Sequence, residues 1–221
     1  MPQSRGILLL GAGGHCLSVL DSLIALSEYD KIGIVDMATS NSTEEGANMI
    51  MGIPVVGTDE DLNQLHKEGY TNAFISVGSV GDVSLRARLY HMLKRIGFEI
   101  PNIIDKSSIV SPFATLGEGI YIGKKSVVNV NTKVGNNCIL NTACIIEHEC
   151  RLGDFVHISP GSVLNGNVRI DAGTHIGAGS IIKQGIHVGS DTMIGMGSIV
   201  LIDIGNNKTA YGNPCKEVAH E

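Results

Sequence analysis

The 221-residue sequence predicts two domains, a parallel α/β domain over residues 1–104 and a parallel β-helix over residues 105–221. Three observations support this fold class. Strands alternate with helices in the N-terminal part, an aliphatic residue recurs every six positions in the C-terminal part, and 28 glycines accompany only 4% aromatic residues. Alternating strands and helices are typical of a parallel sheet, and a period of six is typical of hexapeptide β-helices.

In the N-terminal domain we expect the following elements, given by residue number. The strands are 6–10, 31–36, 73–78 and the short 98–104, and the helices are 16–26, a short one from 58, and 83–96. Thr58 with Asp61 three residues later fits a capping box at the start of the short helix. Gly97 is the residue type that commonly ends a helix such as the last one.

The β-helix prediction depends on sixteen consecutive aliphatic positions, six residues apart, from Val110 to Val200. Chance would give such a run with a probability on the order of 10⁻⁹ or less. The position four residues after each aliphatic is mostly small and should point inward, which buries Cys138, Cys144 and Cys150 and leaves the other two cysteines more reactive. Seven of the aliphatic residues are followed directly by glycine, where we expect turns with positive φ.

Composition and charge exclude several classes of protein. Sixteen Lys and Arg against 22 Asp and Glu give a net charge of −6, and no basic tract could follow a phosphate backbone, so nucleic acid is not an expected partner. No signal peptide or membrane span is evident, which predicts a cytoplasmic protein. Five cysteines without a CxxC pair predict neither a disulfide framework nor a zinc knuckle.

The first strand–helix turn carries three glycines: Gly11, Gly13 and Gly14. They stand where a dinucleotide fingerprint would begin, although Cys16 replaces the third glycine of that motif. Backbone N–H groups at a helix N-terminus can hold phosphate, and Asp36, at the end of the second strand, could accept a hydrogen bond from a ribose or a base. A tight turn without a ligand is the alternative. His15 either contacts the ligand or simply begins the helix.

The densest polar cluster of the repeat is Glu147, His148 and Glu149, which should face outward in a turn. An imidazole flanked by carboxylates suits a general base, although a solvated surface histidine is the alternative. Gly166 lies 18 residues after His148, one full coil of three hexapeptides, and should stack directly on it. A backbone N–H of that turn could stabilise an oxyanion.

Two further histidines, His157 and His175, are also one coil apart and should stack on one face. A zinc site would need three converging imidazoles. Because His148 and His187 lie at other phases of the coil, we expect no metal.

Four segments, GAGGH, GIPVVGTDEDL, ILNTACIIEHECRLGDFVHISPGSVLNGNVRI and AYGNPCK, resemble the NeuD and PglD family of bacterial sugar acetyltransferases. The resemblance covers essentially the whole chain. It implies a Rossmann-like domain that binds a nucleotide-linked amino sugar, and a left-handed β-helix that forms homotrimers and takes acetyl-CoA as co-substrate. Family members often have Asp-Asp at the end of the second strand, whereas here Met37 follows Asp36.

The resemblance also implies roles for individual residues. His148 is then the general base and Glu149 polarises it. The acetyl-CoA site then includes His157, Ala178 and Met196, and the nucleotide pocket includes Gly11, Gly14, His15 and Asp36. Their positions in the sequence add Gly166 to the acetyl-CoA site and Gly13 to the nucleotide pocket. Acetyl-CoA is already activated, so direct transfer needs no nucleophilic serine or cysteine.

Three functions fit these observations. The first is N-acetylation of a nucleotide-linked amino sugar, of the UDP-4-amino-sugar type, in bacterial glycan biosynthesis. The second is O-acetylation of sialic acid or a related free sugar. The third is a non-catalytic protein for nucleotide sensing or assembly, against which the intact His148 and Glu149 argue.

Overall fold

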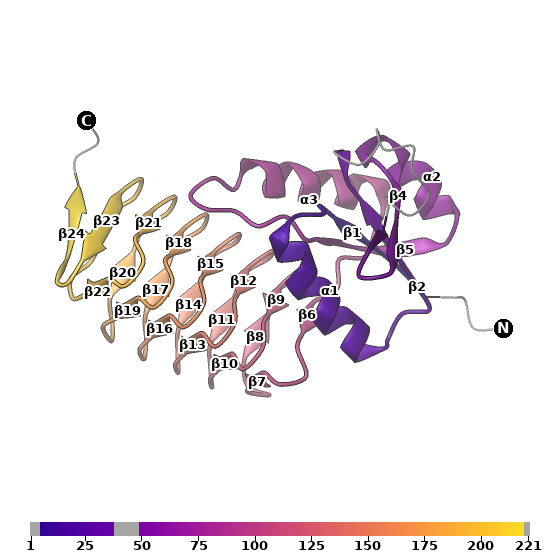
Figure 1. Cartoon of the computed structure of the whole chain (residues 1–221). Coiled ribbons are helices and arrows are strands. Elements are labelled where there is room, and N and C mark those ends of the chain that lie inside the picture. Colours follow the sequence, from indigo (N-terminus) through magenta and orange to yellow (C-terminus); the bar gives the residue numbers. More distant parts are fainter. Residues whose placement is uncertain (1–4, 38–48, 219–221) are drawn as a thin grey trace. The chain divides into compact units, whose positions relative to one another are not determined.

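The structure is a computed structural model that describes residues 5–37 and 49–218 (Figure 1). The chain divides into two compact units. The first unit comprises Met1–Gly78 and Leu85–Ile103, and the second comprises Ser79–Ser84 and Ile104–Glu221. The inclusion of Ser79–Ser84 in the second unit is not evident from any sequence periodicity.

The first unit is an α/β fold with the strand order β3-β4-β2-β1-β5. All neighbours are parallel except β3 and β4. The strands are β1 (Gly6–Leu10), β2 (Lys31–Val35), β3 (Met49–Ile50), β4 (Ile53–Gly57) and β5 (Tyr70–Ile75). The helices are α1 (Gly14–Leu26), the 3₁₀ turn η2 (Asp59–Asp61), α2 (Leu62–Lys67) and α3 (Ser84–Ile96).

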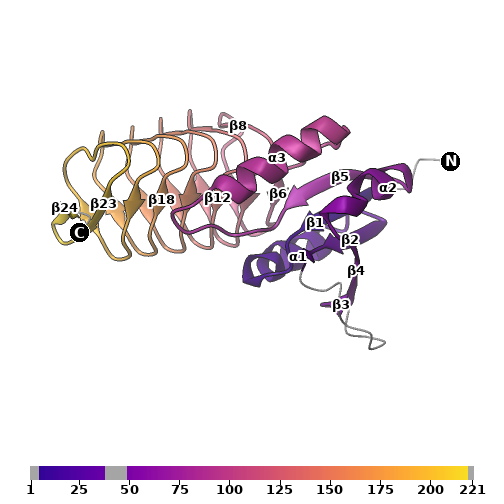
Figure 2. The same ribbon diagram turned by 90° about the horizontal axis from the view of Figure 1, so that it is seen from above.

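Helices α1 and α3 cover opposite faces of this sheet (Figure 2). Leu8 and Leu10 pack in one core cluster with Leu89 and Leu93 of α3. The intervening strand residues point to the other face, because side chains alternate along a strand. The sheet is therefore buried on both sides, as its continuous apolar strands predict.

Most of the predicted elements of the first unit are confirmed, with one strand shifted and one wrong. The third predicted strand begins at Tyr70 and ends at Ile75, rather than spanning 73–78. The predicted strand 98–104 is reduced to a bridge between Glu99 and Asn72. Pro101 has no N–H to donate to a ladder, and Ile103–Ile104 after it is instead β6 of the β-helix.

The second unit is a parallel β-helix of two-residue strands in three sheets, which confirms the predicted fold class. We name the sheets by their outward side chains. The histidine face contains β6 (Ile103–Ile104), β9 (Tyr121–Ile122), β12 (Ile139–Leu140), β15 (His157–Ile158), β18 (His175–Ile176) and β21 (Met193–Ile194), followed by β23 (Thr209–Gly212) and β24 (Cys215–Val218).

The other two sheets follow in each coil. The aliphatic face contains β7 (Ile109–Val110), β10 (Val127–Val128), β13 (Ile145–Ile146), β16 (Val163–Leu164), β19 (Ile181–Ile182) and β22 (Ile199–Val200). The basic face contains β8 (Thr115–Leu116), β11 (Lys133–Val134), β14 (Arg151–Leu152), β17 (Arg169–Ile170) and β20 (His187–Val188). From β7 to β19 each strand pairs in parallel with the strand 18 residues later, as for Ile145 and Val163.

The core of the β-helix is formed by the aliphatic column and the small-residue column, as the period predicts. Cys138, Cys144 and Cys150 are fully buried in it. The expectation that the remaining two cysteines are more accessible is wrong. Cys16, a residue of α1, is buried and Cys215 is buried at the last hairpin, so all five cysteines are buried and none of them forms a disulfide.

The predicted position of the positive-φ residues is also wrong. Positive φ falls three residues after fourteen of the sixteen aliphatic positions, as at Asn131 and Glu149, and not on the glycine that directly follows the aliphatic residue. Those glycines allow neighbouring coils to pack closely, because a side chain there would collide with the next coil. A Cβ on Gly135 would lie 2.7 Å from Asp154 N, and one on Gly153 would lie 2.5 Å from Ala172 N.

The described residues contain no helix with the length and apolarity needed to cross a bilayer.

Candidate active site

His148 and Glu149 occupy the corner of the β-helix between the aliphatic face and the basic face. Glu149 adopts the left-handed conformation, with φ of 61°, and its Oε2 lies 3.1 Å from His148 Nδ1. A carboxylate can only accept, so Nδ1 carries a proton, and in the neutral imidazole the lone pair is then on Nε2. The ring is 46% exposed. This arrangement presents a basic nitrogen to a molecule bound from solvent.

Gly166 lies against the imidazole of His148, as the 18-residue spacing predicts. A Cβ at this position would lie 2.5 Å from both Cε1 and Nε2 of His148. The φ of Gly166 is not in the left-handed region, so the glycine is required for space and not for backbone conformation.

The N–H of Gly166 is available to a ligand beside the histidine. At the corresponding corner position two coils earlier the chain is different, because Asn129 Oδ1 accepts from the next N–H, that of Val130, at 3.1 Å. Asn165 instead turns its amide away and donates to Ile182 O at 2.8 Å. Among the described residues nothing accepts from Gly166 N–H. An oxyanion requires a hydrogen-bond donor of this kind, and here the donor lies next to the basic nitrogen of His148.

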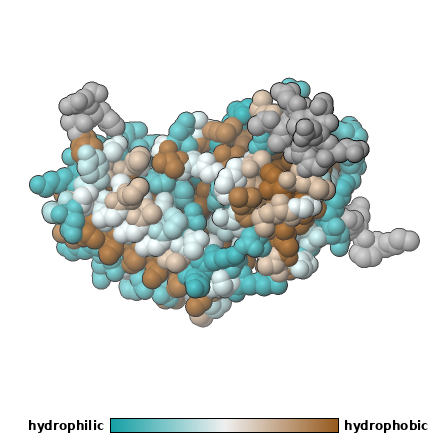
Figure 3. Space-filling model, viewed as in Figure 1, coloured by the Kyte–Doolittle hydropathy of each residue, from teal (hydrophilic) through white to brown (hydrophobic). Residues whose placement is uncertain are grey.

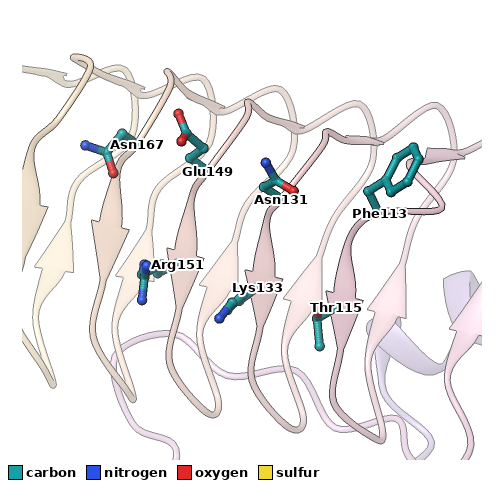
Figure 4. Close-up of a pocket in the computed structure, with 7 residues that line it drawn as sticks. All are labelled: Phe113, Thr115, Asn131, Lys133, Glu149, Arg151 and Asn167. Carbon is teal, nitrogen blue, oxygen red and sulfur yellow. The ribbon is translucent and has the colours of Figure 1, made fainter.

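A hollow of about 260 Å³ adjoins Glu149 on the side of the basic face (Figure 4). Glu149 lies in a row between Asn131 and Asn167, and Lys133 and Arg151 project from the neighbouring strands (Figure 4). Lys133 and Arg151 thus bring two cations to the hollow that Glu149 lines. Sequence inspection missed them, although their 18-residue spacing was a usable signal.

His157 and His175 stack on the histidine face, as predicted, with ring centroids 4.6 Å apart and edge-to-face geometry. His157 Nδ1 donates to Ser79 O at 2.9 Å, and His175 Nε2 lies 3.2 Å from Ser159 Oγ. Burial lowers the pKa of His175, so this imidazole is neutral at pH 7. Over residues 5–37 and 49–218, no cluster of three or more His, Cys, Asp or Glu side chains is arranged to hold a metal.

Ala178 and Met196 lie at a different corner from His148, between the histidine face and the aliphatic face. Both are exposed, Met196 to 80%, and the coils carrying them are joined by the bond from Gly197 N to Ala178 O at 2.8 Å. Within one chain the aliphatic face therefore separates Ala178 and Met196, which are expected to hold acetyl-CoA, from His148 and Glu149, which are expected to act on it. A single site can include both sets only if two copies of the chain contribute to it.

The glycine-rich turn of the first unit is brought together with Asp36 and His15. Ala12 N donates to Asp36 Oδ2 at 2.6 Å, and Gly11 has φ of 102°, which favours glycine. Gly13 and Gly14 have open space where a side chain would be. The turn thus exposes backbone N–H groups at the start of α1, as an anion site requires.

His15 follows this turn and is largely buried. Burial, together with the positive charge of Arg86, lowers the pKa of His15 to about 4. Its imidazole is therefore neutral at pH 7, and it can offer a hydrogen bond to a ligand without a net charge.

A larger pocket of about 640 Å³ lies in the first unit and was not predicted. Its lining residues are Met37, Thr58, Asp59, Glu60, Arg88 and Met92. They come from the ends of β2 and β4 and from α3, so only the tertiary structure brings them together.

Comparison with known proteins places the chain in a family. The family model for the PglD N-terminal domain matches residues 6–93. PerB from Caulobacter crescentus, solved with CoA and GDP-perosamine, is 32% identical, with 97% of each chain covered and a TM-score of 0.88. The acetyltransferase domain of PglB from Neisseria gonorrhoeae, solved with acetyl coenzyme A, is 34% identical, with 97% of this chain and 100% of that one covered and a TM-score of 0.88. The chain belongs to the NeuD and PglD family of sugar acetyltransferases.

This membership confirms the family predicted from the four sequence segments. WeeI from Acinetobacter baumannii, at 20% identity with a TM-score of 0.79, shares the fold. A comparison with curated protein sequences gave no match. The roles of individual residues in this chain are still predictions.

Proposed function

We propose that this family member transfers the acetyl group of acetyl-CoA to the amino group of a nucleotide-linked amino sugar in glycan biosynthesis. The observation that carries the proposal is the His148–Glu149 pair, with its basic Nε2 beside the available N–H of Gly166. The similar PerB, solved with CoA and GDP-perosamine, and the similar PglB domain, solved with acetyl coenzyme A, support the choice of both substrates.

The corner of His148 suits direct acetyl transfer. The sugar nitrogen attacks the thioester carbonyl, and His148 Nε2 accepts the proton that the nitrogen loses as the C–N bond forms. The oxyanion that develops accepts a hydrogen bond from Gly166 N–H. The C–S bond then breaks, and the thiolate takes the proton from the imidazolium. A positioned base contributes about 10²- to 10⁴-fold, and one oxyanion donor contributes about 10²- to 10³-fold.

The aliphatic face favours a homotrimer. Its outward side chains form an in-register column of branched aliphatic residues, Ile109, Val127, Ile145, Val163, Ile181 and Ile199. Ile109 is 67% exposed and Ile181 is 41% exposed. Apolar side chains line the edge of the second unit where Figure 1 labels β22, β19 and β16 (Figure 3). A continuous, partly exposed apolar strip marks an interaction surface.

Closed threefold symmetry would bury this strip and complete the site. Both corners that border the aliphatic face carry predicted site residues, His148 at one and Ala178 and Met196 at the other. Three copies with aliphatic faces toward a common axis bring one corner of each copy beside the other corner of its neighbour. The acetyl-CoA groove then lies between two copies, with His157 on the adjoining histidine face.

We place the enzyme in the cytoplasm. The five cysteines all lie among the described residues and form no disulfide, which fits a reducing compartment.

The test is a thiol-release assay with acetyl-CoA and a panel of amino sugars, each with and without its nucleotide. We expect CoA release only with the nucleotide-linked amino sugars. Release with unlinked sialic acid and no nucleotide sugar would favour O-acetylation, and no release with any acceptor would contradict an enzymatic role.

A further inference from the structure

The pocket of about 640 Å³ in the first unit adjoins the proposed nucleotide turn. It lies at the carboxyl ends of β2 and β4, where ligands bind in parallel sheets. Asp36, whose carboxylate accepts from the glycine-rich turn, also donates its N–H to Gly57 O at 3.1 Å, just before the pocket residue Thr58. The volume is within the range of small-molecule sites. A group attached to a phosphate held at the turn is therefore close to this pocket.

Asp59 and Arg88 lie side by side in the pocket but form no hydrogen bond with each other. Arg88 Nη2 is 3.9 Å from Asp59 Oδ2, which is beyond hydrogen-bond range. Capping of η2 does not use Asp59, because Asp61 Oδ2 accepts from Thr58 N at 2.8 Å and from Thr58 Oγ1 at 3.1 Å. The carboxylate and the guanidinium thus both retain hydrogen-bonding capacity for a ligand.

The rest of the lining suits an aromatic ring. Met37 and Met92 bring thioethers to the pocket, and thioether sulfur makes favourable contacts with aromatic rings. Met37 is 70% exposed, so a planar ligand packed on it would cover an apolar side chain that water now surrounds.

We propose that this pocket binds the base of the sugar nucleotide and selects guanine, an inference that rests on the proposed function. The edge of guanine presents two adjacent donors, N1–H and the exocyclic N2–H, which one carboxylate can accept together, followed by the acceptor O6. Asp59 takes the two donors, and Arg88 donates to O6. This assignment replaces the expected UDP-type substrate with a GDP-linked amino sugar.

The other bases fit the same pair poorly. Uracil has one N–H between two carbonyl oxygens, so an oxygen would face the Asp59 carboxylate. Adenine places an unprotonated N1 beside its single amino group. Leaving a buried polar group unpaired is costly, so both bases bind the pocket less well than guanine.

The test is calorimetric titration of the full-length protein with GDP, IDP, UDP and ADP. IDP differs from GDP only by the missing N2 amino group. We expect GDP to bind at least about tenfold more tightly than each of the others, since a hydrogen bond to a charged group contributes that much or more. Asp59→Asn should weaken GDP binding at least about tenfold and leave UDP binding within about threefold. Glu28→Gln, an exposed charge removal outside the pocket, should change neither.

Two results separate this inference from the proposed function. If UDP binds as tightly as GDP, or Asp59→Asn, with its melting temperature unchanged, leaves GDP binding intact, the guanine assignment is wrong and the proposed function stands. If none of the four nucleotides binds, the nucleotide-linked substrate itself is wrong and the guanine assignment fails with it.

Discussion

Substituting Gly166 with alanine tests whether the position of the His148 imidazole determines the rate. The new Cβ would lie 2.5 Å from Cε1 and Nε2. Since ordinary contacts begin at 3.4 Å, the ring must move by about 0.9 Å. Alanine keeps the backbone N–H, so the oxyanion donor is retained. A misplacement of about 1 Å can cost about 10²-fold, and we expect kcat to fall by about that factor.

The fold should tolerate this substitution. The φ of Gly166 is not in the left-handed region, and the half-exposed ring can swing toward solvent. We therefore expect unfolding free energy to change by no more than about 1 kcal/mol. Gly205→Ala is the matched control, because its Cβ would meet only Lys208 at 3.7 Å. Thiol release from acetyl-CoA gives kcat for both variants. Equal kcat values for Gly166→Ala and Gly205→Ala would refute the assignment of His148 as the base.

Three further predictions follow from the site and the core. His148→Ala should lower kcat by about 10² or more in a folded protein. Refolding the His148→Ala chain together with the Ala178→Trp chain should restore part of the activity, because mixed trimers contain sites in which both residues are intact. No recovery of activity would contradict a site shared between copies. His15→Ala and Asp36→Ala should raise KM for the nucleotide sugar and leave KM for acetyl-CoA unchanged, whereas equal changes in both constants would contradict separate binding regions. Burial raises the pKa of Cys144 to about 12, so its thiolate is scarce at pH 8 and its alkylation in the native protein should stay slow until the pH approaches that value; mass spectrometry showing rapid labelling at pH 8 would contradict the six-residue register.

The six-residue period was sufficient to predict the β-helix, the buried cysteine column and the contact between His148 and Gly166. All three depend on simple spacing, because the coils that carry these residues each contain 18 residues. The position of positive φ was missed because it depends on the path of the turn. A glycine after an aliphatic residue can be required either for close packing or for a positive φ, and the sequence alone does not distinguish the two.

Long-range contacts account for the remaining differences. Nothing local in the sequence indicates that Asp59 and Arg88 line one pocket, since they meet through the packing of α3 against the sheet. The separation of His148 from Ala178 at two corners follows from the coil phase. Its consequence, a site that needs a second copy, becomes clear only with the aliphatic face between them.

The most direct test of the account is identification of the acetylated product. Acetyl-CoA carrying a ¹³C-labelled acetyl group would be incubated with GDP-linked and UDP-linked 4-amino sugars and, separately, with the same sugars freed of their nucleotides. Mass spectrometry and NMR then locate the label. The account predicts one acetyl group on the amino nitrogen of the nucleotide-linked sugar, in equal amount to the CoA released, and almost none with His148→Ala. Label on a hydroxyl of an unlinked sugar, or no transfer to either nucleotide-linked sugar, would contradict it.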